Sequence, residues 1–161
     1  MLMAEFDALP AGAAEAALRE CCASPRWAEQ LVEGRPYGSV GALLDHADAV
    51  LAGLDEAEVD RALAGHPRIG DRPVHASSVR EQAGVADAAP EVRAALAAGN
   101  RTYEQRFGHV YLVCADGRSA AELLDVLRSR LDNDPTTERA VLRAELAGIN
   151  RIRLGRLLAD R

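Results

Sequence analysis

Helix-start signals recur along this chain at short intervals, and they constrain its fold more than any other feature of the sequence. Each one places a side chain that can cap a helix directly before an amphipathic stretch. The signals are Ser24-Pro25, Ser39, Asp55, Ser119-Ala120-Ala121-Glu122 and Asp134-Pro135. In two of them proline follows the cap, which suits the first position of a helix. The chain is therefore predicted to fold as a series of helices with short connections.

The composition supports the same fold class. Aromatic residues make up only 4% of the 161 residues, while 48% are hydrophobic. Few β-branched residues and many Ala, Leu, Glu and Arg favour helix over sheet, and the length allows one sizeable core. We predict an all-α, single-domain bundle of about eight helices covering residues 1–161. The helices are expected at 13–22, 24–32, 39–51, 55–64, 78–82, 90–105, 119–131 and 134–159.

The stretch Phe107–Gly117 breaks the helical pattern. It is rich in β-branched and aromatic residues and is bounded by glycines, as a buried strand would be. No second stretch of this kind offers it a partner strand, so its backbone N–H and C=O groups must bind something else. We expect a short extended segment at about 109–115 that lines a site and holds a polar ligand.

Charge and cysteine content exclude several classes of protein. The net charge of −6 argues against a nucleic-acid partner, although a buried arginine can still bind a small anion. The three cysteines form no C-x-x-C pattern, so neither a disulfide framework nor a zinc site is implied. No apolar run approaches the roughly 18 residues of a membrane span, and the N-terminus lacks a signal peptide's features. We expect a cytoplasmic protein with no membrane partner and no metal.

His66 is the first candidate for chemistry. Pro67 disfavours the helical conformation in the residue before it, so His66 is predicted to leave the helix that starts at Asp55 and to stand at a helix–loop junction. Its ordinary pKa near 6.5 suits proton transfer at neutral pH, although many junction histidines only cap a helix end. The other histidines are not at metal-ligand spacings from it.

Ser78 and Glu81 stand three residues apart on the next predicted helix, and this spacing has two interpretations. It is the spacing of a capping box, in which both side chains close the N-terminus of their own helix. Alternatively, Glu81 and its neighbour Gln82 direct a carboxylate and an amide into the same pocket as His66. The intervening loop is long enough for either arrangement.

Arg153 lies on the apolar stripe of the last predicted helix. At about 100° per residue it falls within roughly 20° of Leu142, whereas Arg151 falls on the opposite face. A guanidinium buried there needs an acceptor: Glu81, a substrate carboxylate or carbonyls of the extended segment. Its side chain could instead run along the apolar surface to solvent.

With these residues in place, the chain resembles the 2-oxo-4-hydroxy-4-carboxy-5-ureidoimidazoline (OHCU) decarboxylase family. This family acts late in urate degradation, within purine metabolism, and yields (S)-allantoin. The resemblance is nearly full length and comprises several motifs in order. They are Cys21-x-x-Ser24-x-x-Trp27, His66-Pro67-Arg68-Ile69-Gly70, Ser78-x-x-Glu81-Gln82, Phe107-Gly108 before Tyr111–Ala115, Arg130-Leu131-x-Asn133 with Glu138, and Arg153-Leu154.

The resemblance implies a carboxy-lyase that needs no cofactor and forms a homodimer. His66 corresponds to the family's acid/base, and Glu81 to its catalytic companion. The residues implied to bind substrate are Pro67, Ser78, Gln82, Tyr111, Leu112, Val113, Cys114, Ala115 and Arg153. Where the family often has an apolar residue and a proline after Phe-Gly, this chain has His109-Val110, for which we predict a structural role.

Two alternatives remain open at the level of sequence. One is a lyase for another small carboxylated heterocycle on the same scaffold. The other is a non-catalytic helical interaction module, against which the set of His66, Glu81, Gln82 and Arg153 argues, because binding alone needs no titratable pair.

Overall fold

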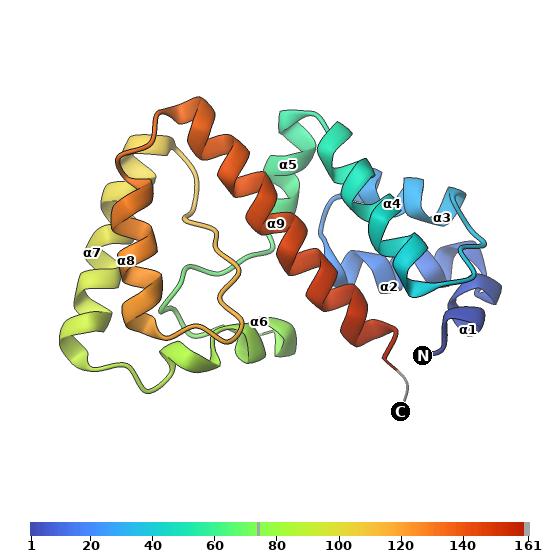
Figure 1. The fold of residues 1–161 in the computed structure, drawn as a ribbon, viewed down its shortest axis with the longest axis horizontal. Coiled ribbons are helices and arrows are strands. Elements are labelled where there is room, and N and C mark those ends of the chain that lie inside the picture. The colour runs from blue at the N-terminus through green and yellow to red at the C-terminus, as the bar shows by residue number, and fades with distance from the viewer. Residues whose placement is uncertain (74, 160–161) are drawn as a thin grey trace. The chain divides into compact units, whose positions relative to one another are not determined.

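The computed structural model describes residues 1–73 and 75–159, and within them it is all-α, as predicted (Figure 1). Nine α-helices, one 3₁₀ turn and no β-strand are found in these residues. The helices are α1 Met3–Ala8, α2 Ala11–Cys21, α3 Pro25–Glu33, α4 Val40–Gly53, α5 Glu56–Leu63, α6 Ala76–Glu81, α7 Pro90–Phe107, α8 Ala120–Arg130 and α9 Pro135–Leu157, with the 3₁₀ turn η1 at Ala83–Val85.

The first helix, α1, was not among the eight expected. It has only six residues, too few to show a helical period in the sequence. The Glu5 carboxylate accepts the backbone N–H of Leu2 at 2.7 Å and so closes the N-terminus of this helix. Phe6 is its one buried residue. A single anchoring side chain and a local cap are enough to form the extra turn.

The described chain divides into two compact units. Unit 1 consists of residues 1–65 and 147–161, and unit 2 of residues 66–146, so α9 contributes to both. That residues 1–161 behave as a single domain stays a prediction. Among the described residues, no helix is both long and apolar enough to cross a membrane.

Unit 1 is built from the predicted capped helices. Ser24, Ser39 and Asp55 each accept a hydrogen bond from the backbone N–H three residues further on, at 3.1, 3.2 and 2.8 Å. These bonds satisfy donors that the first turn of a helix leaves unpaired. Trp27 is fully buried in this unit and donates from its indole N–H to the Ala47 carbonyl. Local capping and the burial of one large aromatic side chain therefore stabilise these helices.

Unit 2 contains the pair α7 and α8, which lie side by side (Figure 1). The approach is close because Gly99 has no side chain: a Cβ there would lie 2.5 Å from Leu127 Cδ2. The segment 109–115 is neither helix nor strand and runs as an open trace from the end of α7 to the start of α8 (Figure 1). It has no partner strand in the described part of the chain, as predicted.

Candidate functional site

His66 stands outside helix α5, as its proline neighbour predicts. The helix ends at Leu63, and residues 66–68 belong to no regular element. The His66 side chain is half-buried. Two residues after Pro67, Ile69 is buried in the core of unit 2, and Gly70 then turns with a φ of 96°, which glycine adopts without strain.

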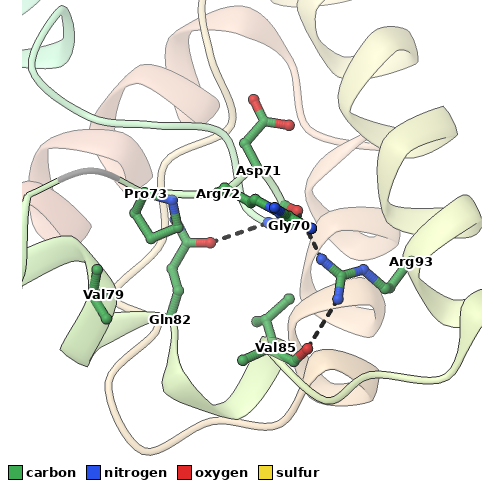
Figure 2. Close-up of a pocket in the computed structure, with 9 residues that line it drawn as sticks. Gly70, Asp71, Arg72, Pro73, Val79, Gln82, Val85 and Arg93 are labelled. Carbon is green, nitrogen blue, oxygen red and sulfur yellow. Dashed lines mark hydrogen bonds between the residues drawn. The ribbon is translucent and has the colours of Figure 1, made fainter.

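Side chains from α6 and α7 hold the loop that follows His66. Gln82, directly after α6, donates from Nε2 to the Arg68 carbonyl at 3.3 Å. Its Oε1 accepts the Gly70 N–H at 3.1 Å (Figure 2). Arg93 on α7 donates to the Gly70 carbonyl at 3.4 Å from the other side (Figure 2). Consecutive peptide groups of the loop are therefore bound individually by side chains.

Two more residues of α7 complete this hold, and the sequence analysis missed both. Asn100 is 3% exposed and donates from Nδ2 to the Ile69 carbonyl at 2.9 Å. Glu104 binds the Arg68 guanidinium, with Nε at 2.6 Å. Together with Arg93 they stand at positions i, i+7 and i+11, which is one face of a helix. This polar face on the helix expected at 90–105 is the signal that could have revealed them.

Helix α6 corrects one interpretation of Ser78 and Glu81. The helix begins at Ala76, with His75 before it, and not at Ser78. Ser78 is therefore in the body of the helix and Glu81 is its last residue, so the two do not form a capping box. Both are buried, at 3% and 7% exposure, in the same unit as His66. The capping interpretation is thus excluded, and a catalytic role of Glu81 stays a prediction.

The segment 111–115 is bound on alternate residues. The Leu112 carbonyl accepts from Arg130 at 2.6 Å, and the Cys114 N–H donates to the Glu145 carboxylate at 2.9 Å. In an extended chain the N–H and C=O of residues i and i+2 point to one edge, and those of i+1 to the other. The backbone groups of Val113, between the two, have no hydrogen-bond partner in the described residues. The predicted free backbone groups of this segment are therefore those on the edge to which Val113 points.

A buried ion pair supports this segment. Arg130 donates from Nε to Glu138 at 2.7 Å, and these side chains are only 4% and 0% exposed. Glu138 also accepts from the Tyr103 hydroxyl, and the Arg130 guanidinium lies 4.9 Å from the centre of the Tyr111 ring. Burial lowers the pKa of Arg130, but its hydrogen bond and attraction to Glu138 outweigh this and raise it. Arg130 is therefore a fixed cation that anchors the Leu112 carbonyl.

His109 packs among aromatic side chains of the same unit. Its ring centre lies 5.6 Å from that of Tyr103 and 6.2 Å from that of Phe107. The imidazole Nδ1 lies 3.1 Å from the Val110 carbonyl. These contacts support the structural role predicted for His109.

Arg153 lies in unit 1 and is 8% exposed, so of the two alternatives left open by the sequence the structure favours the buried guanidinium over a side chain that runs out to solvent. One guanidinium nitrogen donates to the Cys21 carbonyl at 3.1 Å, an acceptor 132 residues away that sequence reasoning did not foresee. Arg151 lies on the other face, as predicted, and pairs with Asp45 and Asp48.

The cysteines show no sign of a reactive thiol or of a metal site. Burial raises the pKa of the Cys22 thiol, and likewise that of Cys114, which disfavours a reactive thiolate. In the described part of the chain, no cluster of three His, Cys, Asp or Glu residues could hold a metal.

A pocket of about 680 Å³ opens beside the loop that follows His66 (Figure 2). Gly70, Gln82 and Arg93 are among the residues that line it, but His66 and Glu81 are not.

Comparisons with known proteins agree on one family. Residues 7–155 match the model of the family described as OHCU decarboxylase. The curated Arabidopsis thaliana protein "Uric acid degradation bifunctional protein TTL" is 29% identical over 149 residues, which are 88% of this chain and 46% of the relative. The chain thus spans about half the length of that relative.

Solved structures give the same result for the fold. A crystal structure of OHCU decarboxylase in the presence of (S)-allantoin superposes with a TM-score of 0.80 at 26% identity, covering 88% of this chain and 96% of the other. A crystal structure of (S)-allantoin synthase gives a TM-score of 0.78 at 15% identity, covering 99% of this chain and 54% of the other, and shows the fold alone.

Proposed function

The chain belongs to the OHCU decarboxylase family, and from this premise we propose that it decarboxylates OHCU to (S)-allantoin in urate degradation. One observation carries the proposal from family to activity. His66 stands clear of its helix on a loop whose following peptide groups are individually bound, in the unit that also contains the buried Glu81. Fixed loops beside buried titratable groups are typical of catalytic sites rather than of helical interaction modules.

The chemistry requires no cofactor. The substrate carboxylate leaves a ring carbon next to a C=N bond, so the electron pair released is accepted within the substrate. The protein must orient the carboxylate, stabilise the charge that develops on the ring and control a proton on one face. We assign the proton to His66, with Glu81 setting its protonation state or binding the ureido group.

We assign substrate binding in unit 2 to two groups of residues. Pro67 and Ser78 are adjacent in sequence to the catalytic residues or share their helix. In the segment Tyr111–Ala115, the backbone groups of Val113 are the ones proposed to bind the polar ring, because those of Leu112 and Cys114 are already engaged.

Freshly generated OHCU provides the test of this function. The circular dichroism of the allantoin formed measures the enzyme, because spontaneous decay of OHCU gives the racemate. We expect the wild type to produce (S)-allantoin and His66→Asn to lose about 100-fold or more in kcat. His75→Asn is the matched control, since His75 is exposed and should be replaceable without effect.

Other outcomes favour the alternatives. A wild type that turns over another carboxylated heterocycle but not OHCU indicates a different lyase, and one that turns over neither indicates an interaction module. A His66→Asn variant with wild-type rate removes His66 from the mechanism.

We also propose a homodimer in the cytoplasm, as the family resemblance implies. Analytical ultracentrifugation should give twice the 17.2 kDa mass of the chain. A monomer at micromolar concentration would contradict the proposal.

A further inference from the structure

Glu145, a half-buried residue of α9, accepts the Cys114 N–H at 2.9 Å, and both residues lie in unit 2. The sequence analysis gave Glu145 no role. We propose that Glu145 is a positioning residue: by holding the Cys114 N–H, it orients the Val113 carbonyl toward the substrate. This inference rests on the proposed decarboxylase function, in which the backbone groups of Val113 bind the polar ring.

The link between Glu145 and Val113 is a single peptide group. The peptide bond between Val113 and Cys114 is trans. The Val113 C=O and the Cys114 N–H therefore lie in one rigid plane and point in opposite directions. A carboxylate that fixes the direction of this N–H fixes the direction of the C=O as well. Glu145 thus needs no contact with the substrate to determine where the Val113 carbonyl points.

Arg130 orients the preceding peptide group in the same way. Its guanidinium donates to the Leu112 carbonyl at 2.6 Å, and this carbonyl shares a plane with the Val113 N–H. Arg130 is itself fixed by its buried pair with Glu138. The donor and the acceptor of Val113 are therefore each oriented by one charged side chain, and both side chains bind the opposite edge of the segment.

Contacts at both ends hold the segment on either side of Val113. At its start the Tyr111 hydroxyl donates to the Leu123 carbonyl at 3.0 Å. At its end the Ala115 carbonyl accepts the Arg118 N–H at 3.0 Å. Val113 is only 3% exposed, and peptide groups buried without a partner are rare in native proteins. A donor and an acceptor held in this way suit a ring that carries a C=O beside an N–H, as a cyclic urea does.

Kinetics test this role with two substitutions of Glu145. Glu145→Leu keeps much of the bulk of the side chain and removes the acceptor. We expect KM to rise about 10-fold, the effect of about one net hydrogen bond, while kcat changes by less than about threefold. Glu145→Gln keeps an acceptor oxygen at the same length, so its KM should stay within about twofold of the wild type. Glu122→Leu, at an exposed glutamate of α8, is the matched control and should leave both constants unchanged.

Hydrogen exchange tests the positioning step without relying on activity. The Cys114 amide should exchange slowly in the wild type and in Glu145→Gln, and about 10-fold faster or more in Glu145→Leu. The Leu127 amide, inside α8, should keep the same exchange rate in all three proteins. A residue that only stabilises the fold would instead change the exchange of Cys114 and Leu127 together, and this result overturns the inference.

Glu145→Asp separates the reach of the side chain from its charge. It keeps the carboxylate but is one methylene too short to bind the same N–H, so KM should rise and exchange of the Cys114 amide should accelerate, as in Glu145→Leu. This variant replaces Glu145→Leu if the latter does not fold. A Glu145→Asp protein with the KM of the wild type, beside an impaired Glu145→Gln, means that the charge acts rather than the hydrogen bond, and overturns the inference.

Failure of this inference is distinguishable from failure of the proposed function. A wild type that makes no (S)-allantoin above the spontaneous background overturns the proposed function. An active wild type whose Glu145→Leu variant keeps the KM of the wild type, or keeps the same exchange rate at the Cys114 amide, overturns the role of Glu145 alone.

Discussion

The two units of the molecule use buried polar side chains differently. In unit 1 they close helix ends: Ser24, for example, accepts the Trp27 N–H and donates to Glu58 at 2.7 Å. In unit 2 they bind irregular backbone: Arg130 and Asn100 each donate to the carbonyl of a residue outside any helix. Buried Ser24 in unit 1 thus serves regular structure, whereas buried Arg130 and Asn100 in unit 2 order the two segments that regular structure leaves out.

This difference coincides with the distribution of candidate functional residues. All of them except Arg153 fall in unit 2, on or beside the irregular segments. In a helix the backbone N–H and C=O groups form hydrogen bonds with one another, whereas a loop held by side chains leaves some of its backbone groups available to bind a ligand. We therefore expect that removing a side chain that holds an irregular segment of unit 2 lowers the free energy of unfolding more than removing a helix cap of unit 1 does.

The largest effect is expected at Arg130. Arg130→Met leaves Glu138 buried without its cation and the Leu112 carbonyl without its donor, which should cost about 3–5 kcal/mol in the free energy of unfolding. Urea denaturation followed by circular dichroism measures this. Arg151→Met, which breaks an exposed pair in unit 1, should change stability little.

The reciprocal change at the same pair sharpens the test. Arg130→Met combined with Glu138→Leu removes both charges and should recover much of the loss. If the double variant is as unstable as the single one, the Leu112 contact rather than the buried charge dominates.

The next effect concerns activity at the end of α6. Glu81→Gln preserves the shape of a buried side chain that lies outside any capping box, so the free energy of unfolding should shift by less than about 1 kcal/mol. If Glu81 is the companion of His66, kcat should fall about 100-fold. Parallel measurements of kcat and of the thermal midpoint decide between a catalytic and a structural role. A lowered thermal midpoint with an unchanged kcat would make Glu81 a structural residue.

A smaller effect is expected at a cap of unit 1. Ser24→Ala removes the acceptor for the Trp27 N–H and a hydrogen bond to Glu58, and should cost about 1–2 kcal/mol. The measurement is again urea denaturation, with Ser39→Ala, an exposed cap without a second bond, as the milder comparison. A Ser24→Ala loss larger than that of Arg130→Met would reverse the ranking of the two units.

The smallest effect is a dependence on pH at Glu58. The hydrogen bond from Ser24, with smaller contributions from Arg26 N–H and Arg61, holds the pKa of Glu58 below its ordinary 4.5 despite partial burial. The folded state thus favours the ionised carboxylate, and this stabilisation is present above pH 4.5 and lost as the pH falls below it. The thermal midpoint of Glu58→Gln should approach that of the wild type as the pH is lowered.

The helices of unit 1 could be predicted because their signals are local. Ser24, Ser39 and Asp55 bond to backbone three residues away, within the span of a sequence motif. Helical periodicity likewise predicted that Arg153 is on an inward stripe. It could not supply the acceptor, because Cys21 is 132 residues distant.

The candidate site was less accessible to sequence reasoning. The position of His66 followed from Pro67, but the bond from Asn100 to Ile69 joins residues 31 apart and has no local signature beyond a polar face on α7. The start of α6 was placed two residues late because a serine three before a glutamate imitates a cap. Local patterns locate the reactive groups, and the tertiary fold decides what holds them.

The pairing of Arg130 with Glu138 also constrains which substitutions this sequence can accumulate in evolution. Replacing either residue alone leaves an uncompensated charge among Tyr103, Tyr111 and the Leu112 carbonyl, so each single step passes through a destabilised ancestor. The two positions should consequently change together or not at all across a set of homologous sequences. Chains that have lost one member of the pair should also have altered the segment before α8.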